Sequence, residues 1–190
     1  WERICETDNV VAVKTAGFNR YLTLDVVRAA TFSSRKDKIA LYTGNDDNIV
    51  NDLITPFSFQ KDGRTYENRF VGGLLGHWAV WTATVVKMFR ELKQAVEGDA
   101  LDPAWLTLAA QITDANSAFF DTANNFKGCI AGVHEPIDFV VSQGLMKGIW
   151  CLNPAETLSP GQSAEIDRVW SMYPHLNDDA FVKEFLAEEA

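Results

Sequence analysis

The chain has 190 residues, 47% of them hydrophobic and 23% charged, a length and composition ordinary for a globular protein with one sizeable core. Its formal net charge is −9, with no basic stripe, which argues against nucleic acid as the main partner and against anionic membranes. No apolar run approaches the roughly 20 residues of a membrane span, so no membrane partner is expected.

The first part of the chain predicts alternating strands and helices. Apolar and β-branched runs predict three strands, over residues 10–15, 38–44 and 69–76. Thr23 is the predicted cap of a short helix over 25–30, and a second helix runs from 48 to 53 before Thr55-Pro56. The polar stretch 60–65 predicts a loop. This alternation implies parallel strands joined by right-handed crossovers.

After Gly76 the pattern predicts only helices. Apolar residues recur every three or four positions from Trp78 to Val96, and Asp102-Pro103 opens a further helix. A third helix is expected over 128–141. The sequence Ser159-Pro160-Gly161-Gln162 predicts a capping box with Pro at the first helical position, and a last helix follows residues 177–179. The predicted organisation is therefore an α/β segment over 1–97 and a helical domain over 98–190.

Three parallel strands are too few for a complete sheet of this kind. Parallel strands are normally buried on both faces, by helices or by closure into a barrel. We therefore expect the remaining strands to be encoded upstream or supplied by another chain. The first residues, Trp1-Glu2-Arg3, form no signal peptide and lack an initiator Met, so a processed, truncated or incomplete end is expected.

The cysteines and histidines predict neither a disulfide framework nor a metal site. Cys5, Cys129 and Cys151 are odd in number and widely spaced, and no Cys/His pair has zinc-site spacing. Free thiols of this kind favour a reducing, cytoplasmic location. We expect no metal and no cofactor.

Lys14 is the most informative residue for function. It ends the β-branched run Val10-Val11-Ala12-Val13, so it lies where active sites of α/β proteins gather. A partly desolvated amine there loses its proton more readily and can attack a carbonyl to form a Schiff base. The alternative is a lysine that only ends the strand with a solvated charge.

The order of these segments resembles the C-terminal half of the dihydrodipicolinate synthase / N-acetylneuraminate lyase family, closest to a divergent dihydrodipicolinate synthase-like branch. The resemblance rests on the Val-Ala-Val-Lys-Thr strand end, the turn Gly44-Asn45-Asp46-Asp47, the strand 71–76 and the helical tail. It implies a partial TIM (β/α)₈ barrel, its last three strands, followed by a C-terminal helical domain. It also implies a class I aldolase or lyase acting on pyruvate or a related 2-oxo acid.

The resemblance assigns roles residue by residue. Lys14 matches the Schiff-base lysine. The positions matching substrate-binding residues are Gly44, Asn45, Gly73, Leu75 and His77, of which His77 is as well explained by packing. Family members are oligomers, so a homo-oligomer, or a partner that supplies the missing strands, is expected.

The chain departs from the family in ways that affect activity. The first five barrel strands are absent, and with them the family's carboxylate-binding threonine pair and its proton-relaying tyrosine. Thr15 replaces the acidic residue that often follows the lysine. Tyr42 and Tyr66 do not lie in the matching context.

Two further interpretations stay open. A non-catalytic partial barrel could use its exposed sheet and aromatic helices for association or oligomerisation. A phosphate- or nucleotide-binding domain is suggested by the glycines of residues 72–76, but neither GxGxxG nor GxxxxGK[ST] occurs.

Overall fold

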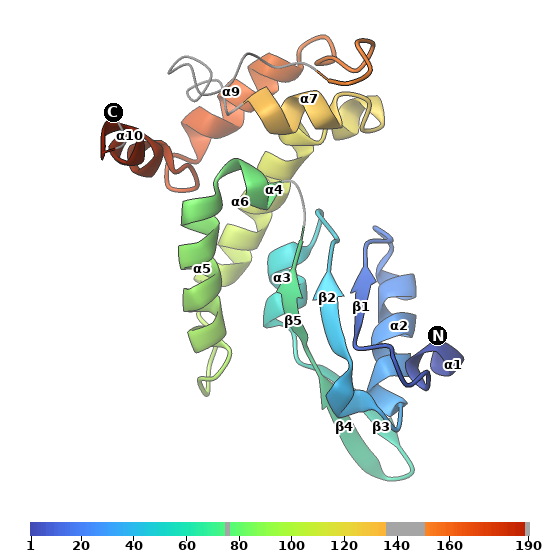
Figure 1. Cartoon of the computed structure of the whole chain (residues 1–190). Coiled ribbons are helices and arrows are strands. Elements are labelled where there is room, and N and C mark those ends of the chain that lie inside the picture. The colour runs from blue at the N-terminus through green and yellow to red at the C-terminus, as the bar shows by residue number, and fades with distance from the viewer. Residues whose placement is uncertain (75–76, 136–150, 189–190) are drawn as a thin grey trace. The chain divides into compact units, whose positions relative to one another are not determined.

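The computed structural model describes residues 1–74, 77–135 and 151–188 and shows a mixed α/β chain (Figure 1). The chain divides into two compact units. One comprises Trp1–Leu75 with Pro103–Ala109, and contains all the strands of the described residues. The other comprises Gly76–Asp102 with Ala110–Ala190, and its regular structure is helical. We refer to them as the N-terminal unit and the C-terminal unit.

The N-terminal unit is built on a three-stranded parallel sheet, as predicted. Its strands are β1 (Ala12–Thr15), β2 (Ala40–Thr43) and β5 (Phe70–Gly73), in the order β1-β2-β5. Lys14 pairs with Tyr42, and Thr15 pairs with Thr43. All three strands therefore end at the same edge, which brings the residues that follow them together.

Two helices cover the same face of this sheet. They are α2 (Arg20–Phe32) and α3 (Ile49–Ile54). Asn45, just after β2, donates a hydrogen bond to Thr23 of α2, and Thr43 of β2 donates to Asp52 of α3. Figure 1 shows both helices lying behind the strands. The strand order follows the chain order, with the crossover helices on one side only.

The start of α2 differs from the prediction. Asn19 caps the helix, because its side-chain oxygen accepts hydrogen bonds from the amides of Tyr21 and Leu22 at 3.0 and 3.2 Å. The predicted cap, Thr23, is instead a buried residue within the helix. The helix is longer than predicted at both ends, because it begins at Arg20 after the Asn19 cap and its buried face continues through Thr31.

The sheet face opposite the helices is open in the described part of the chain. Along β1 and β2 the buried residues are Val13, Thr15, Leu41 and Thr43, all on the helix-covered side. Lys14 alternates with them and is exposed, and Val71 of β5 has 61% of its surface exposed. A parallel sheet with one uncovered face is unusual, because such sheets are normally buried on both sides.

The predicted loop over 60–65 is wrong. The chain forms an antiparallel hairpin of β3 (Phe57–Lys61) and β4 (Arg64–Asn68). Its turn residues Asp62 and Gly63 have φ of 51° and 72°, as a two-residue type I′ turn requires. The Phe32 ring of α2 lies edge-on to both Phe59 and Tyr66, with centroids 6.0 and 5.5 Å apart. These aromatic contacts hold the hairpin against the end of α2.

The same end of the N-terminal unit also carries α1 (Glu2–Cys5) and the 3₁₀ turn η1 (Lys36–Lys38). Arg35 lies between them and donates hydrogen bonds to the carbonyls of Thr7, Asp8 and Val10. One guanidinium therefore fixes the segment that leads into β1.

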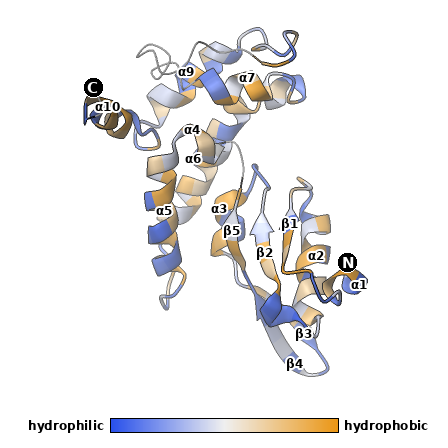
Figure 2. Ribbon diagram, viewed as in Figure 1, coloured by the Kyte–Doolittle hydropathy of each residue, from blue (hydrophilic) through white to orange (hydrophobic). Residues whose placement is uncertain are grey.

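The C-terminal unit confirms the predicted change to helices. Its elements are α4 (His77–Val80), α5 (Thr82–Ala95), α6 (Ala104–Phe119, whose first residues belong to the N-terminal unit), η2 (Thr122–Asn124), α7 (Cys129–His134), α9 (Gln162–Met172) and α10 (Asp179–Glu188). Figure 2 shows hydrophilic and hydrophobic residues together along α5, as its amphipathic sequence predicts. Trp81 interrupts the single helix expected over 78–96. Of the helix expected over 128–141, residues 136–141 lie outside the described residues.

A buried polar cluster supports the C-terminal unit and includes part of the predicted capping box. The Gln162 side-chain oxygen accepts a hydrogen bond from the Ser159 amide at 3.0 Å, as a capping box requires. The Ser159 hydroxyl, however, donates to Asp121, and the Gln162 backbone amide donates to the Ser159 carbonyl, whereas in a capping box that amide would donate to the hydroxyl. Asp121 also accepts bonds from Asn124 and the Gly128 amide. The helix α9 itself begins at Gln162, after Gly161, and not at Pro160.

Candidate functional site

The candidate site lies at the edge where β1, β2 and β5 end. Four of the predicted site residues lie at this edge, namely Lys14, Gly44, Asn45 and Gly73. Leu75 lies outside the described residues, and so does the side chain of His77, whose backbone begins α4. The prediction for these two residues is therefore not addressed by the structure.

Lys14 lies directly against Gly44. The Lys14 Nζ atom is 3.2 Å from the point that a Cβ atom on Gly44 would occupy, and the Lys14 Cε atom is closer still. The Gly44 amide donates a 2.6 Å hydrogen bond to the Thr15 carbonyl, so the turn after β2 is tied to the end of β1. Glycine at this position gives the lysine side chain room to cross the backbone.

In the part of the chain that the structure describes, the Lys14 side chain is exposed on the open face of the sheet. The desolvated surroundings that the sequence led us to expect are not present there. Tyr42 is its register partner on β2, and the Tyr42 ring passes over Gly72 of β5. The open face at this edge therefore carries one amine and one phenol.

Gly73 and Asn45 face inwards. A Cβ atom on Gly73 would lie 2.9 Å from Ile49 Cδ1 and 3.1 Å from Thr43 Cγ2, so this glycine allows α3 to pack closely on the sheet. Asn45 is 1% exposed, and its amide donates to Asp52 at 2.9 Å and to Thr23 at 3.3 Å. Its side-chain oxygen accepts a bond from the Phe18 amide. The Asn45 side chain is thus engaged within the fold.

Asp52 is the residue at this edge that sequence reasoning missed. It is fully buried, and each carboxylate oxygen accepts two hydrogen bonds. Oδ1 accepts from Arg20 at 2.5 Å and Asn48 at 3.3 Å, and Oδ2 accepts from Thr43 at 2.6 Å and Asn45 at 2.9 Å. An aspartate within a six-residue helix carries no sequence pattern that predicts this role.

Asp46 follows Asn45 in the same turn and is 5% exposed. Burial raises the pKa of the Asp46 carboxyl above its ordinary value, and the neighbouring Asp47 carboxylate raises it further. Both effects disfavour the charged form of Asp46, so the turn that carries Gly44 also holds a buried titratable group.

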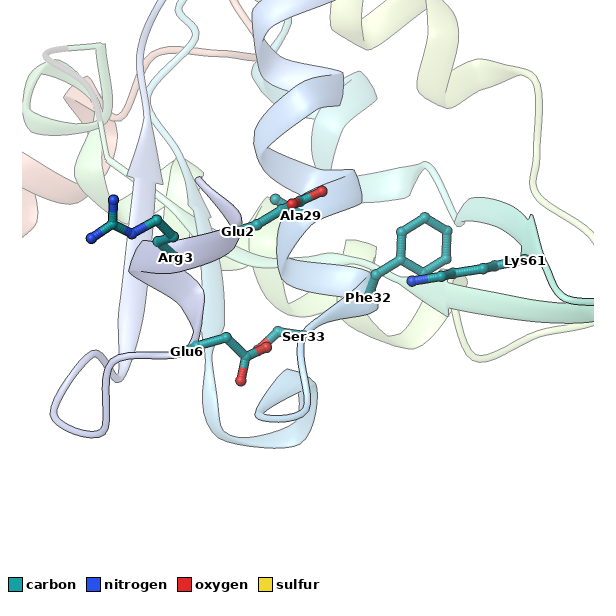
Figure 3. Close-up of a pocket in the computed structure, with 7 residues that line it drawn as sticks. All are labelled: Glu2, Arg3, Glu6, Ala29, Phe32, Ser33 and Lys61. Carbon is teal, nitrogen blue, oxygen red and sulfur yellow. The ribbon is translucent and has the colours of Figure 1, made fainter.

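A separate pocket lies at the opposite end of the N-terminal unit. Residues of α1, the end of α2 and β3 line it, and Figure 3 shows Lys61 beside the Phe32 ring and Glu6 close to Ser33. The Lys61 ammonium is 5.0 Å from the centroid of that ring. Because α2 ends at this pocket while the strands end at Lys14, the pocket plays no part in the candidate site.

Neither a family model nor a curated protein sequence matches the chain. In the part of the chain that the structure describes, no group of three or more His, Cys, Asp or Glu side chains is arranged to hold a metal ion. Within the same ranges, no helix is both long and apolar enough to cross a membrane.

Proposed function

We propose that this chain forms part of a Schiff-base class I aldolase or lyase that acts on pyruvate or a related 2-oxo acid. The observation that supports this most directly is the position of Lys14, which ends a parallel strand and crosses Gly44 on the open face of the sheet. A primary amine at the carboxyl end of a parallel strand is well located for attack on a bound carbonyl. The family resemblance of the sequence points to the same chemistry.

The same proposal gives the sheet a place in a (β/α)₈ barrel. Open doubly wound sheets have helices on both faces, whereas a barrel has sequential strands with all helices outside. The order β1-β2-β5, with α2 and α3 on one face, fits a barrel segment. Residues 1–97 would supply the last three strands, and 98–190 the appended helical domain. The other strands, from this protein or a partner, would cover the open face and desolvate Lys14.

The proposed reaction begins at the Lys14 amine in its neutral form. The nitrogen attacks C2 of the 2-oxo acid, the carbonyl electron pair moves onto oxygen, and two proton transfers release that oxygen as water. The resulting iminium withdraws electrons from the adjacent carbon. In the cleavage direction a hydroxyl group on C4 loses its proton, the C3–C4 bond breaks, C4 leaves as an aldehyde and the bonding electrons form an enamine, which is protonated at C3 to restore the iminium. In the synthetic direction the iminium loses a proton from C3 to give the enamine, which adds to an aldehyde whose oxygen is then protonated. Water then hydrolyses the imine and regenerates the amine.

Covalent trapping tests the proposal. The full-length protein is incubated with pyruvate and borohydride, and its peptides are mapped by mass spectrometry. We expect a reduced pyruvate adduct on the Lys14 peptide, and none on the peptide of Lys38, an exposed lysine of the same unit. Lys14→Ala should abolish the adduct. Equal trapping in wild-type protein and Lys14→Ala, or equal labelling of Lys38, would show that Lys14 is not the Schiff-base residue.

A second candidate function is association without catalysis. It is favoured by the uncovered sheet face, where Val71 is 61% exposed, and by β1 and β5, the two outer strands of the sheet, to which another chain could pair. It predicts a stable oligomer by light scattering, in which the thiol introduced by Val71→Cys is protected from alkylation, together with no pyruvate adduct. A compact monomer in which the Val71→Cys thiol is freely alkylated would count against this function.

A further inference from the structure

We propose that Asp52 is a positioning residue for Lys14, acting through the turn that contains Gly44. The catalytic part of this inference rests on the proposed function, whereas the placement of the Lys14 side chain can be tested without it. The inference is carried by the hydrogen bonds that converge on one fully buried carboxylate.

Asp52 holds both residues that flank Gly44. Thr43 and Asn45 each donate to Oδ2, at 2.6 and 2.9 Å. The backbone amide of Asn45 donates to Thr43 Oγ1 at 3.2 Å, which closes a compact ring around the glycine. Because the Lys14 side chain lies against Gly44, a shift of this turn moves the surface on which the lysine rests.

Asp52 also fixes the chain that follows Lys14. Arg20, at the start of α2, donates to Oδ1 at 2.5 Å, and the Arg20 side chain is 38% exposed while the Asp52 side chain is fully buried. The Phe18 amide donates to Asn45, which Asp52 holds. The loops after β1 and after β2 are therefore joined through one side chain, and both border the amine.

The carboxylate cannot be replaced by an amide without conflict. Both oxygens of Asp52 accept two hydrogen bonds, whereas asparagine has one oxygen and an NH₂ group that only donates. In Asp52→Asn the side-chain NH₂ group therefore faces either the Arg20 and Asn48 donors or the Thr43 and Asn45 donors, and neither pair can hydrogen-bond to it. It also leaves Arg20 without its anionic partner. The size of the side chain is unchanged, so the substitution tests the hydrogen bonding and the charge.

The experiment compares Asp52→Asn with Thr31→Val in the full-length protein. Thr31 donates a buried 2.7 Å hydrogen bond to the Val27 carbonyl near the other end of α2. Thr31→Val therefore also removes one buried hydrogen bond, but at a position away from the turn. Two measurements need no catalysis: hydrogen exchange of the Gly44 amide, and competitive acetylation of Lys14 relative to Lys38. A third is the single-turnover rate constant for imine formation at saturating pyruvate, which, unlike the amplitude, is independent of the folded fraction.

For Asp52→Asn we expect the hydrogen-exchange rate of the Gly44 amide to rise about 10-fold or more, because the turn loses a charge-assisted hydrogen bond. The Lys14:Lys38 acetylation ratio should change, and the imine rate constant should fall about 10²-fold, the usual effect of small misplacement. Thr31→Val should change none of the three. Thr43→Val, which removes one donor and keeps the Arg20 ion pair, should act in the same direction but less strongly.

The outcomes separate the two proposals. The positioning role is refuted if the Lys14:Lys38 acetylation ratio and the exchange rate of the Gly44 amide are the same in Asp52→Asn and Thr43→Val as in the control Thr31→Val. It is refuted equally if exchange rises but the ratio and the imine rate constant stay at wild-type values. If the wild-type protein forms no imine while the acetylation ratio changes as expected, the positioning role stands and the proposed lyase function fails.

Discussion

The side chain of Lys14 lies across the backbone of Gly44, with Nζ 3.2 Å from where a Cβ atom on that glycine would be. Lys14 lies in β1 and Gly44 in the turn that follows β2, and the Gly44 amide donates a hydrogen bond to the Thr15 carbonyl. The position of the amine thus depends on the absence of a side chain at residue 44. This dependence can be tested with a single methyl group.

Gly44→Ala should displace Lys14 with little effect on folding. The added Cβ meets the flexible end of an exposed lysine and Ala16 Cβ at 3.1 Å, so we expect the free energy of unfolding to fall by at most about 1 kcal/mol. The rate constant for imine formation should fall about 10²-fold. Gly17→Ala is the matched control, because a Cβ there meets nothing within 4 Å. Equal imine rates for both variants would show that the contact is incidental.

Asp121 should make the stability of the C-terminal unit depend on pH. Burial raises the pKa of this carboxyl, but the hydrogen bonds from Asn124, Ser159 and the Gly128 amide outweigh it, so the pKa lies below the ordinary 3.8. For a lowered pKa, the stabilisation is complete above the unfolded-state pKa, near 3.8, and is lost as the pH falls through the native value.

Asp121→Asn tests this dependence, because asparagine tolerates the left-handed backbone found here, with φ of 56°. We expect the free energy of unfolding at pH 7 to fall by about 2 kcal/mol. The difference from wild type should shrink as the pH is lowered below about 4. Asp62→Asn makes the same chemical change at an exposed residue with φ of 51°, and should be nearly neutral. Urea unfolding across pH would contradict the idea if the two variants behaved alike.

The strands of the sheet were predictable because their physical cause is local. Most residues of Val10–Val13 and Ile39–Thr43 are apolar or β-branched, and each run overlaps a strand that buries one of its faces. The hairpin was missed because polar residues at 60–65 conceal the alternation of Phe57, Phe59 and Tyr66. The Asp62-Gly63 pair was the available signal, since both residues accept positive φ.

The site was predictable in part. Lys14 and Gly44 lie close together because neighbouring parallel strands end at the same side of a sheet. The alternation of strands and helices in the sequence already predicts parallel strands. The role of Asn45 was not predictable, because its side chain turns inwards only when α3 brings a carboxylate beneath it. Asp52 could not be found for the same reason. Its hydrogen bonds join segments separated by up to 32 residues.

Gly63→Ala should weaken the hairpin. The residue has φ of 72°, a conformation that costs an alanine about 1 kcal/mol. Because Phe59 and Tyr66 pack against Phe32 of α2, we expect Gly63→Ala to lower the free energy of unfolding of the whole N-terminal unit and not only the stability of the hairpin. Hydrogen exchange of the Phe59 and Tyr66 amides, a hydrogen-bonded pair of the ladder, should become faster. The Gly17→Ala variant again serves as the control, and a loss of equal size there would contradict a turn-specific effect.

Asp178 should respond to pH with the opposite sign to Asp121. Its carboxylate accepts a 2.8 Å hydrogen bond from the Ala83 amide in the first turn of α5. Burial raises the pKa of Asp178, and the bond from Ala83 only partly offsets this. A raised native pKa means that the charged form is disfavoured in the fold. This contribution therefore destabilises the native state as the pH rises from the unfolded-state pKa through the native one.

Two substitutions at residue 178 separate the charge from the hydrogen bond. Asp178→Asn keeps an acceptor for Ala83 and removes the buried charge, so it should be at least as stable as wild type at pH 7. That advantage should shrink as the pH falls below the native pKa and vanish below the unfolded-state pKa, where the wild-type carboxyl is neutral in both states. Asp178→Ala loses the acceptor and should lower the free energy of unfolding by about 1 kcal/mol at pH 7. Should the Asn variant be as unstable as the Ala variant in thermal unfolding, the charge of Asp178, and not only its hydrogen bond, would be what stabilises the start of α5.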